Sequence, residues 1–199
     1  VALTTGNYNS YIGFQSGNGQ ITGVQNTGVG YRTLYTSTDG DRNTAVGVSA
    51  LETFSEGTSG DGDNTAVGYA AGRYIEEGIK NTFIGSEAGL GITGDKLDGD
   101  FNTAIGYNAG KVLQGAAHSN TLIGTTSGVA LTTGISNVAV GLNAGAAMTT
   151  TSYAVLIGAS AGDAINSTDA NSSVAIGVSA LGANTSGRYN VAIGKEALK

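Results

Sequence analysis

Three Asp-Gly-Asp runs are the most chemically suggestive stretches of this sequence. Their carboxylates belong to Asp39, Asp41, Asp61, Asp63, Asp98 and Asp100. Calcium takes six to eight oxygens from carboxylates, carbonyls and water, so these runs could supply ligands to a calcium ion. The same residues suit tight turns, in which Asp bonds to the local backbone and Gly supplies the dihedral angles. Because the runs lack the residue order of a dedicated calcium loop, the sequence favours turns and no cofactor, with calcium as the alternative.

Enzymatic chemistry has little support in the remaining polar residues. His118 is the only histidine, so one chain cannot assemble a histidine metal cluster, and we expect a loop residue there. Glu76 and Glu77, with Asp61 and Asp63, are the only close acidic groupings that could suggest glycosidase chemistry, but nothing in their spacing places two carboxylates across a sugar. We therefore predict that the protein is not an enzyme, and we rank a polysaccharide depolymerase last among the alternatives.

Aromatic residues offer a second kind of chemistry, because their rings can stack on sugars or contact a partner. Tyr31, Tyr69 and Tyr107 each follow a glycine, and with Phe54 they are the predicted receptor contacts. Corner packing is the favoured alternative for the tyrosines, since Val48 occupies the same position in another repeat. The long insertions at 54–63 and 90–100 are better candidates for ligand contact, because outer loops can vary without disturbing a stacked structure.

A repeat spanning the whole chain must position these residues. It aligns on a glycine that follows a β-branched residue, at Gly13, Gly30, Gly47, Gly68, Gly85, Gly106, Gly124, Gly141, Gly158, Gly177 and Gly194. Successive glycines are 17 residues apart, with occasional intervals of 18, 19 or 21. Stacked coils produce such a period, because the stacked part keeps its length while outer loops vary.

A short strand is expected in every unit. The residue before the glycine is always Val or Ile, at Ile12, Val29, Val46, Val67, Ile84, Ile105, Ile123, Val140, Ile157, Ile176 and Ile193. Two positions earlier stands Ser, Thr or Val, and the column between is mostly Ala. We predict that the Val/Ile column forms the core inside the coil and that the Ala/Gly face packs closely against a flat surface.

The rest of each unit completes the coil. A less regular apolar patch, for example Ile21, Tyr35, Phe54, Ile75, Ile92, Leu113, Leu131 or Ile165, predicts a second, outer strand. A glycine such as Gly110 is expected at a turn with positive φ. Recurring asparagines such as Asn102 are expected to form a ladder along the stack. The predicted fold is an all-β parallel β-solenoid of about eleven coils, two short strands per coil, as a single domain over 1–199.

Composition excludes several partners. Charged residues form 12% of the chain, the net charge is −6 and the pI is near 4.5, so nucleic acid is not an expected partner. No apolar run approaches the ~20 residues needed to span a bilayer, so no membrane span is expected. The regularly spaced β-branched residues argue against disorder.

The repeat also resembles known families. Ser173 to Gly177 and Asn190 to Gly194 are similar to head repeats of YadA-like trimeric autotransporter adhesins. The stretch Asn64 to Gly72 resembles repeats of bacteriophage tail-fibre proteins. The resemblance covers the chain from about Asn9 to Leu198. It implies a left-handed β-roll, three of which associate side by side as a homotrimer.

The expected function is that of a structural and interaction protein. We predict a trimeric extracellular fibre segment, on a virion tail fibre or a cell surface, that attaches to a host or surface. Its expected partners are other copies of itself, neighbouring fibre segments and a cell-surface glycan or protein receptor. The alternative is an ice-binding solenoid that uses the Thr column from Thr27 to Thr121. Since that column shares a face with Val and Ile, we expect it to be buried, which argues against ice binding.

Overall fold

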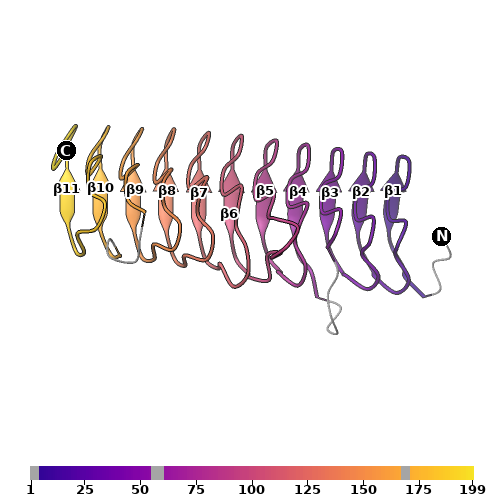
Figure 1. Cartoon of the computed structure of the whole chain (residues 1–199). Coiled ribbons are helices and arrows are strands. Elements are labelled where there is room, and N and C mark those ends of the chain that lie inside the picture. The colour runs from indigo at the N-terminus through magenta and orange to yellow at the C-terminus, as the bar shows by residue number, and fades with distance from the viewer. Residues whose placement is uncertain (1–4, 55–60, 167–170) are drawn as a thin grey trace.

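The protein is a straight stack of short parallel strands (Figure 1), seen in a computed structural model that describes residues 5–54, 61–166 and 171–199. In chain order the strands are β1 (Ser10–Ile12), β2 (Thr27–Val29), β3 (Thr44–Val46), β4 (Thr65–Val67), β5 (Thr82–Ile84), β6 (Thr103–Ile105), β7 (Thr121–Ile123), β8 (Val138–Val140), β9 (Val155–Ile157), β10 (Val174–Ile176) and β11 (Val191–Ile193). They form one sheet in which each strand pairs only with its neighbours in sequence. No helix occurs in the described ranges. The predicted all-β parallel solenoid is confirmed.

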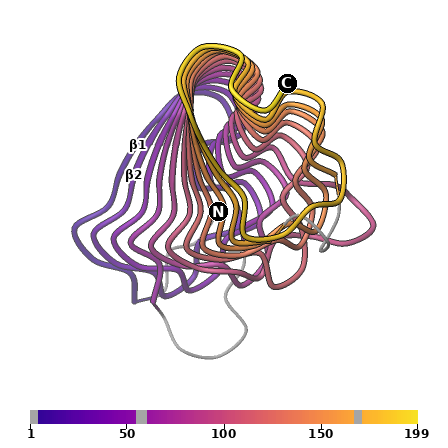
Figure 2. The same cartoon turned by 90° about the vertical axis from the view of Figure 1, so that its left-hand side faces the viewer.

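Every repeat lies in register with the next. Thr103, for example, pairs with Thr82 on one side and Thr121 on the other, so each sequence column becomes a row along the stack. Viewed along the axis in Figure 2, the coils superimpose: the strands line one side, and the loops that vary in length spread over the other sides. At the usual strand spacing, the eleven strands span about 50 Å.

The predicted direction of the strand side chains is wrong. The central column, which includes Ala104, Leu122 and Ala139, is fully buried inside the coil. The Val/Ile column predicted as core faces outward: Ile12 and Ile193 are 66% and 68% exposed at the two ends, and the members between are partly exposed. Alternation separates two faces of a strand but does not say which one points inward. The narrow coil interior selects the smaller column, so the β-branched residues stack on the outside.

Volumes inside the coil are matched between the strand and the turn that follows it. Phe83 is buried opposite Gly89, where an added Cβ would lie 2.2 Å from the Phe83 ring. After the small Ala45 the turn instead carries a buried Leu51 at a φ of 49°. After Ala104 the turn has Gly110, and the buried Leu113 further along the coil lies against it. Each large buried side chain stabilises the fold by about 1.5–3 kcal/mol. The core is therefore continuous, although no single coil could hold one alone.

The glycine after each strand is required by geometry. Gly106 has a φ of 129°, and a Cβ there would lie 2.6 Å from the carbonyl oxygen of Gly124 in the next coil. The Gly124 amide in turn donates to the Ile105 carbonyl at 2.8 Å. The coils thus approach each other too closely for a side chain along this glycine column.

The predicted second strand does not form. Within the described ranges, pairing outside the eleven strands is limited to isolated bridges from Leu97 to Ile75 and to Gly115. Successive residues with positive φ bend the chain too often for a strand, as at Asn108 and Gly110. The turn segments still fill the interior, because Phe54, Ile75, Leu113, Leu131 and Ile165 are buried, whereas Ile21, Tyr35 and Ile92 are partly or largely exposed.

The asparagine ladder is confirmed. Asn81 Oδ1 accepts from the backbone amide of Asn102 at 2.8 Å and from its side-chain amide at 3.1 Å. The Asn102 side-chain amide also donates to the Ala117 carbonyl at 2.8 Å. Equivalent bonds to the backbone amide of the next coil run from Asn9 to Asn137. The last one ends on the amide of Ala154 at 3.0 Å. These buried amides tie each coil to the next on the inner side of the sheet.

Candidate functional site

The outer face, defined as the first and third residues of strands β1 to β11, is the largest candidate surface. All of its residues are Ser, Thr, Val or Ile, and none is charged. Most are partly exposed, and those of the end strands are more exposed. A contiguous uncharged face of this length is unusual on a monomer and is typical of an interaction surface.

The outer face has two chemically different halves. Strands β2 to β7, the Thr half, carry Thr at the first position, whereas strands β8 to β11, the Val half, carry Val there. In the Thr half each hydroxyl lies beside those of the neighbouring strands, as Thr82 lies between Thr65 and Thr103. In the Val half, Val155 lies between Val138 and Val174. The Val half therefore lacks hydroxyls at these positions.

Aromatic rings flank the outer face on the side that follows each strand. The rings of Phe14 and Tyr31 stack with centroids 5.9 Å apart, and Tyr69 and Tyr107 are about half exposed. The tyrosines predicted as receptor contacts are therefore accessible in the single chain, and the corner-packing alternative does not describe them. Phe54, in contrast, is fully buried, so its prediction as a contact is wrong.

The Asp-Gly-Asp runs serve as connections between coils. Asp41 Oδ1 accepts from the Val24 amide at 2.7 Å, and Asp100 Oδ1 accepts from the Ile79 amide at 2.8 Å. Asp39 accepts from the hydroxyl of Thr38 at 2.9 Å. These carboxylates thus bond to a neighbouring coil or residue instead of converging on one point. Among the described residues, no three Asp, Glu or His side chains are grouped in a way that could hold a metal ion.

The middle run is neutralised by an arginine. Arg42 Nε lies 2.7 Å from Asp63 Oδ1, and its Nη2 lies 3.1 Å from Asp61 Oδ1. The hydrogen bond from Arg42 lowers the pKa of Asp63. A carboxylate pair already bound to a guanidinium is a poor cation site, so this run supports the turn interpretation.

The acidic groups near the third run lie differently. Partial desolvation, together with the nearby Glu76, raises the pKa of Asp98. Glu76 itself pairs with Lys96, with Oε1 and Nζ 2.9 Å apart. Glu76 and Asp98 both lie in the loops that connect the strands. Of the insertion at 54–63, which was predicted to contact a ligand, residues 55–60 lie outside the described residues.

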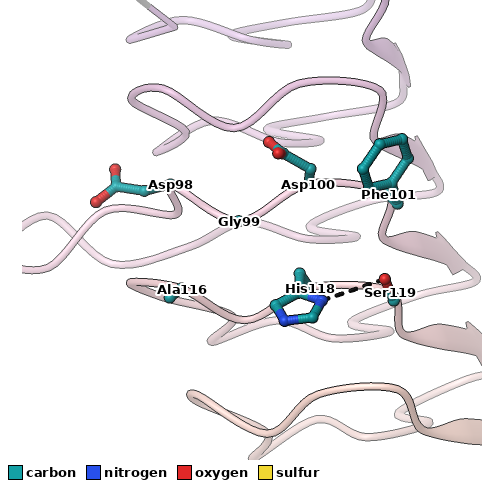
Figure 3. A pocket seen from close by; sticks show the side chains of 7 residues that line it. All are labelled: Asp98, Gly99, Asp100, Phe101, Ala116, His118 and Ser119. Carbon is teal, nitrogen blue, oxygen red and sulfur yellow. Dashed lines mark hydrogen bonds between the residues drawn. The ribbon is translucent and has the colours of Figure 1, made fainter.

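A hollow of about 390 Å³ opens beside the third run (Figure 3). Asp100 and Phe101 line it from one coil, and His118 and Ser119 line it from the next. His118 Nδ1 lies 3.2 Å from Ser119 Oγ, and Asp98 points away from Asp100 in this view. His118 is thus a loop residue as predicted, but it lines a surface hollow that the sequence did not indicate.

A buried ion-pair network was also missed by sequence reasoning. The Glu52 side chain is almost fully buried between Arg32 and Arg73, at 2.9 Å and 2.6 Å. Arg32 packs over the Tyr35 ring and Arg73 over the Tyr74 ring. Because both guanidinium groups are paired with the same carboxylate, this network fixes three successive coils to one another.

Comparison of the chain with models of known protein families, with curated proteins and with solved structures gave no match. In the part of the chain that the structure describes, no helix has the length and apolar character needed to cross a membrane. The function therefore has to be argued from the surfaces themselves.

Proposed function

We propose that the protein is a structural and interaction module, an extracellular fibre segment in which three copies associate side by side and which attaches to a host or surface. The observation that carries this proposal is the uncharged outer face, which extends over all eleven strands. Its Val and Ile side chains remain partly exposed in one chain, and burying them against other copies would stabilise the assembly.

Other copies of this chain are the occupant that best fits the outer face. The face carries uncharged Ser, Thr, Val or Ile residues in register at every level, so parallel copies around a common axis would place like columns beside one another along the whole stack. The variable loops spread over the other sides, so such an assembly would leave them accessible (Figure 2). Three copies are favoured by the resemblance to trimeric adhesin and tail-fibre repeats.

Attachment follows from the shape of such a fibre. Three copies of each exposed site would be held at fixed spacing on a stiff rod, so weak contacts with a surface would act together. A virion tail fibre or a cell-surface adhesin both use this arrangement, and the repeats resemble those of each.

Light scattering tests the assembly directly. The particle mass should be threefold the 19.7 kDa of one chain. Replacing Ile123 in the middle of the outer face by Arg should lower the mass to that of one chain, because the unpaired charge would be buried. Thr93→Arg, in an exposed loop, is the matched control and should leave the mass unchanged. A folded monomer of the natural sequence would refute the trimer.

Ice binding is the second candidate, and one observation favours it more than the sequence did. The column from Thr27 to Thr121 faces outward and is partly exposed, instead of being buried. If the protein is a monomer that inhibits ice recrystallisation, and Thr82→Tyr or Thr103→Tyr abolishes this without unfolding it, the Thr half binds ice. In the proposed trimer the column is covered, and no such activity is expected.

A further inference from the structure

We propose a binding site for neutral oligosaccharides along the corner of the solenoid that precedes the strands. It is formed by the corner column, defined as Phe101, Ser119, Ser136, Tyr153, Ser172 and Tyr189, each two residues before strands β6 to β11. This proposal rests on the proposed attachment function and names the class of molecule that is recognised.

The column alternates exposed rings with small side chains. Phe101 and Tyr153 are both 56% exposed, and Tyr189 is 75% exposed. Two serines separate the first ring from the second, and one serine separates the second from the third. At the usual strand spacing the rings are about 14 Å and about 10 Å apart. Because the serine side chains are small, they leave space between successive rings of the column.

The backbone holds this column rigidly. All six residues have a φ between 56° and 61°. Their amides donate to the preceding coil, for example from Ser119 to the Asp100 carbonyl at 2.9 Å and from Tyr153 to the Ile135 carbonyl at 3.0 Å. A ring on a fixed backbone loses little conformational entropy when a ligand stacks on it.

The hollow in Figure 3 is the first step of this column. It exists because the column changes from the bulky Lys80 and Phe101 to Ser119, so one edge of the Phe101 ring is left without a large neighbour on that side. Asp100 has one carboxylate oxygen bound to the Ile79 amide of the preceding coil, so the carboxylate points away from His118 and Ser119 of the next coil. A hollow lined by an apolar ring, an imidazole and a hydroxyl suits a sugar, which has an apolar face and many hydroxyl groups.

Charge decides which sugars fit. Asp98 and Asp100 line the hollow and the chain carries a net charge of −6, so acidic glycans would be repelled. The separation between rings requires an extended ligand, because one sugar unit cannot contact both Phe101 and Tyr153. Neutral linear oligosaccharides are therefore the expected ligands.

An array of immobilised neutral and sialylated glycans tests the proposal with the intact chain. We expect binding to neutral oligosaccharides and not to their sialylated counterparts. Phe101→Ala, Tyr153→Ala and Tyr189→Ala should each weaken binding roughly three- to tenfold, the loss expected for one aromatic contact. Tyr153→Phe should retain binding. Leu142→Ala is the matched control, because its side chain is 53% exposed at the other edge of the strands and belongs to no predicted contact.

Absence of glycan binding, or an equal loss in Leu142→Ala, would overturn the site. So would a fall in particle mass in the Phe101, Tyr153 or Tyr189 variants, because the corner column would then be an interface between copies. A trimer that binds no glycan would refute this site alone. A monomer that binds neutral glycans through these rings would refute the trimer and retain the site.

Discussion

The Thr half and the Val half of the stack share one backbone but differ in how they are held. In the Thr half a buried asparagine ladder joins the coils, and ion pairs such as those of Glu52 and Arg42 join the loops. In the Val half the ladder ends at Ala154, and Ser173 replaces the next asparagine. The comparison indicates that polar connections inside the chain diminish where the outer face becomes fully apolar. The Val half is therefore expected to depend more on neighbouring copies.

The largest expected effect is one that both halves should share. Gly106→Ala and Gly158→Ala each place a Cβ 2.6 Å from a carbonyl oxygen of the next coil, at φ near 130°. Each substitution should cost about 4 kcal/mol or more, because the backbone has to move. Thermal unfolding measures it. A much milder effect at Gly158 would mean that the coils of the Val half are less tightly stacked.

Substitutions in the asparagine ladder should have a smaller effect on the free energy of unfolding, and one that differs between the two halves. Asn102→Ala removes a buried amide that donates to Ala117 and accepts from Asn120, at a cost of about 2–4 kcal/mol. Ser173→Ala, at the equivalent position of the Val half, removes one 3.2 Å bond to the Gly187 carbonyl and should cost about 1 kcal/mol. Denaturant unfolding of both variants tests this, and equal costs would contradict the comparison.

On the outer face, a substitution in the Val half should be more damaging than the equivalent substitution in the Thr half. Val155→Asp places a carboxylate between Val138 and Val174, whereas Thr82→Asp places it between two threonine hydroxyls that can donate to it. Association of the chains should be weakened at least about tenfold more by Val155→Asp, equivalent to about 1.4 kcal/mol. Concentration-dependent light scattering measures the difference. A greater loss from Thr82→Asp would place the main contact in the Thr half.

The smallest expected effect concerns pH. Arg42 holds the pKa of Asp63 below its usual range, so the stability from this pair is present above the unfolded pKa of about 3.9 and is lost as pH falls through the folded value. Both side chains are more than a third exposed, so the effect is small. Hydrogen exchange should show that opening of the coils around Asp63 becomes more frequent as pH falls in the natural protein, whereas Asp63→Asn should lack this pH dependence. Identical profiles would assign no role to the pair.

Asp98 should respond in the opposite direction, because its folded pKa is raised by desolvation and nearby acidic groups. Stability then falls as pH rises from the unfolded pKa through the folded one. Asp98→Asn should remove this dependence and slightly raise the melting temperature at neutral pH. An unchanged pH profile would show that the raised pKa does not contribute to stability.

The stack of parallel strands could be predicted from the sequence, but which strand side chains fill its interior could not. The fixed interval between glycines determines the strands, their order and the asparagine ladder, because identical columns can only lie above one another. The prediction of which strand face points inward was wrong, because Val46 and Ala45 are both compatible with a strand and alternation alone does not show which of them is buried. Two signals in the sequence identify the inward face. The large Phe83 is followed by Gly89, which leaves room for its ring, and the buried Asn81 lies two residues before Phe83, so both side chains point to the same side of the strand.

Less of the candidate site than of the fold could be predicted from the sequence. The exposed tyrosines were singled out by their position after a glycine, whereas the corner column was not, since Phe101 and Tyr153 lie in loops whose lengths vary. Glu52 was missed because its partners Arg32 and Arg73 are about twenty residues away on either side and meet only through stacking.

The serial arrangement of coils has a mechanical consequence. Strands β1 and β11 lie at opposite ends of the stack (Figure 1), so a pull between them loads the hydrogen bonds of successive coils one after another. The terminal coils, bonded to a neighbour on one side only, would peel first. Each released coil of 17 residues lengthens the chain by about 50 Å once its share of the stack is subtracted. A tether of this kind would yield in even steps under load and dissipate work before its attachment fails.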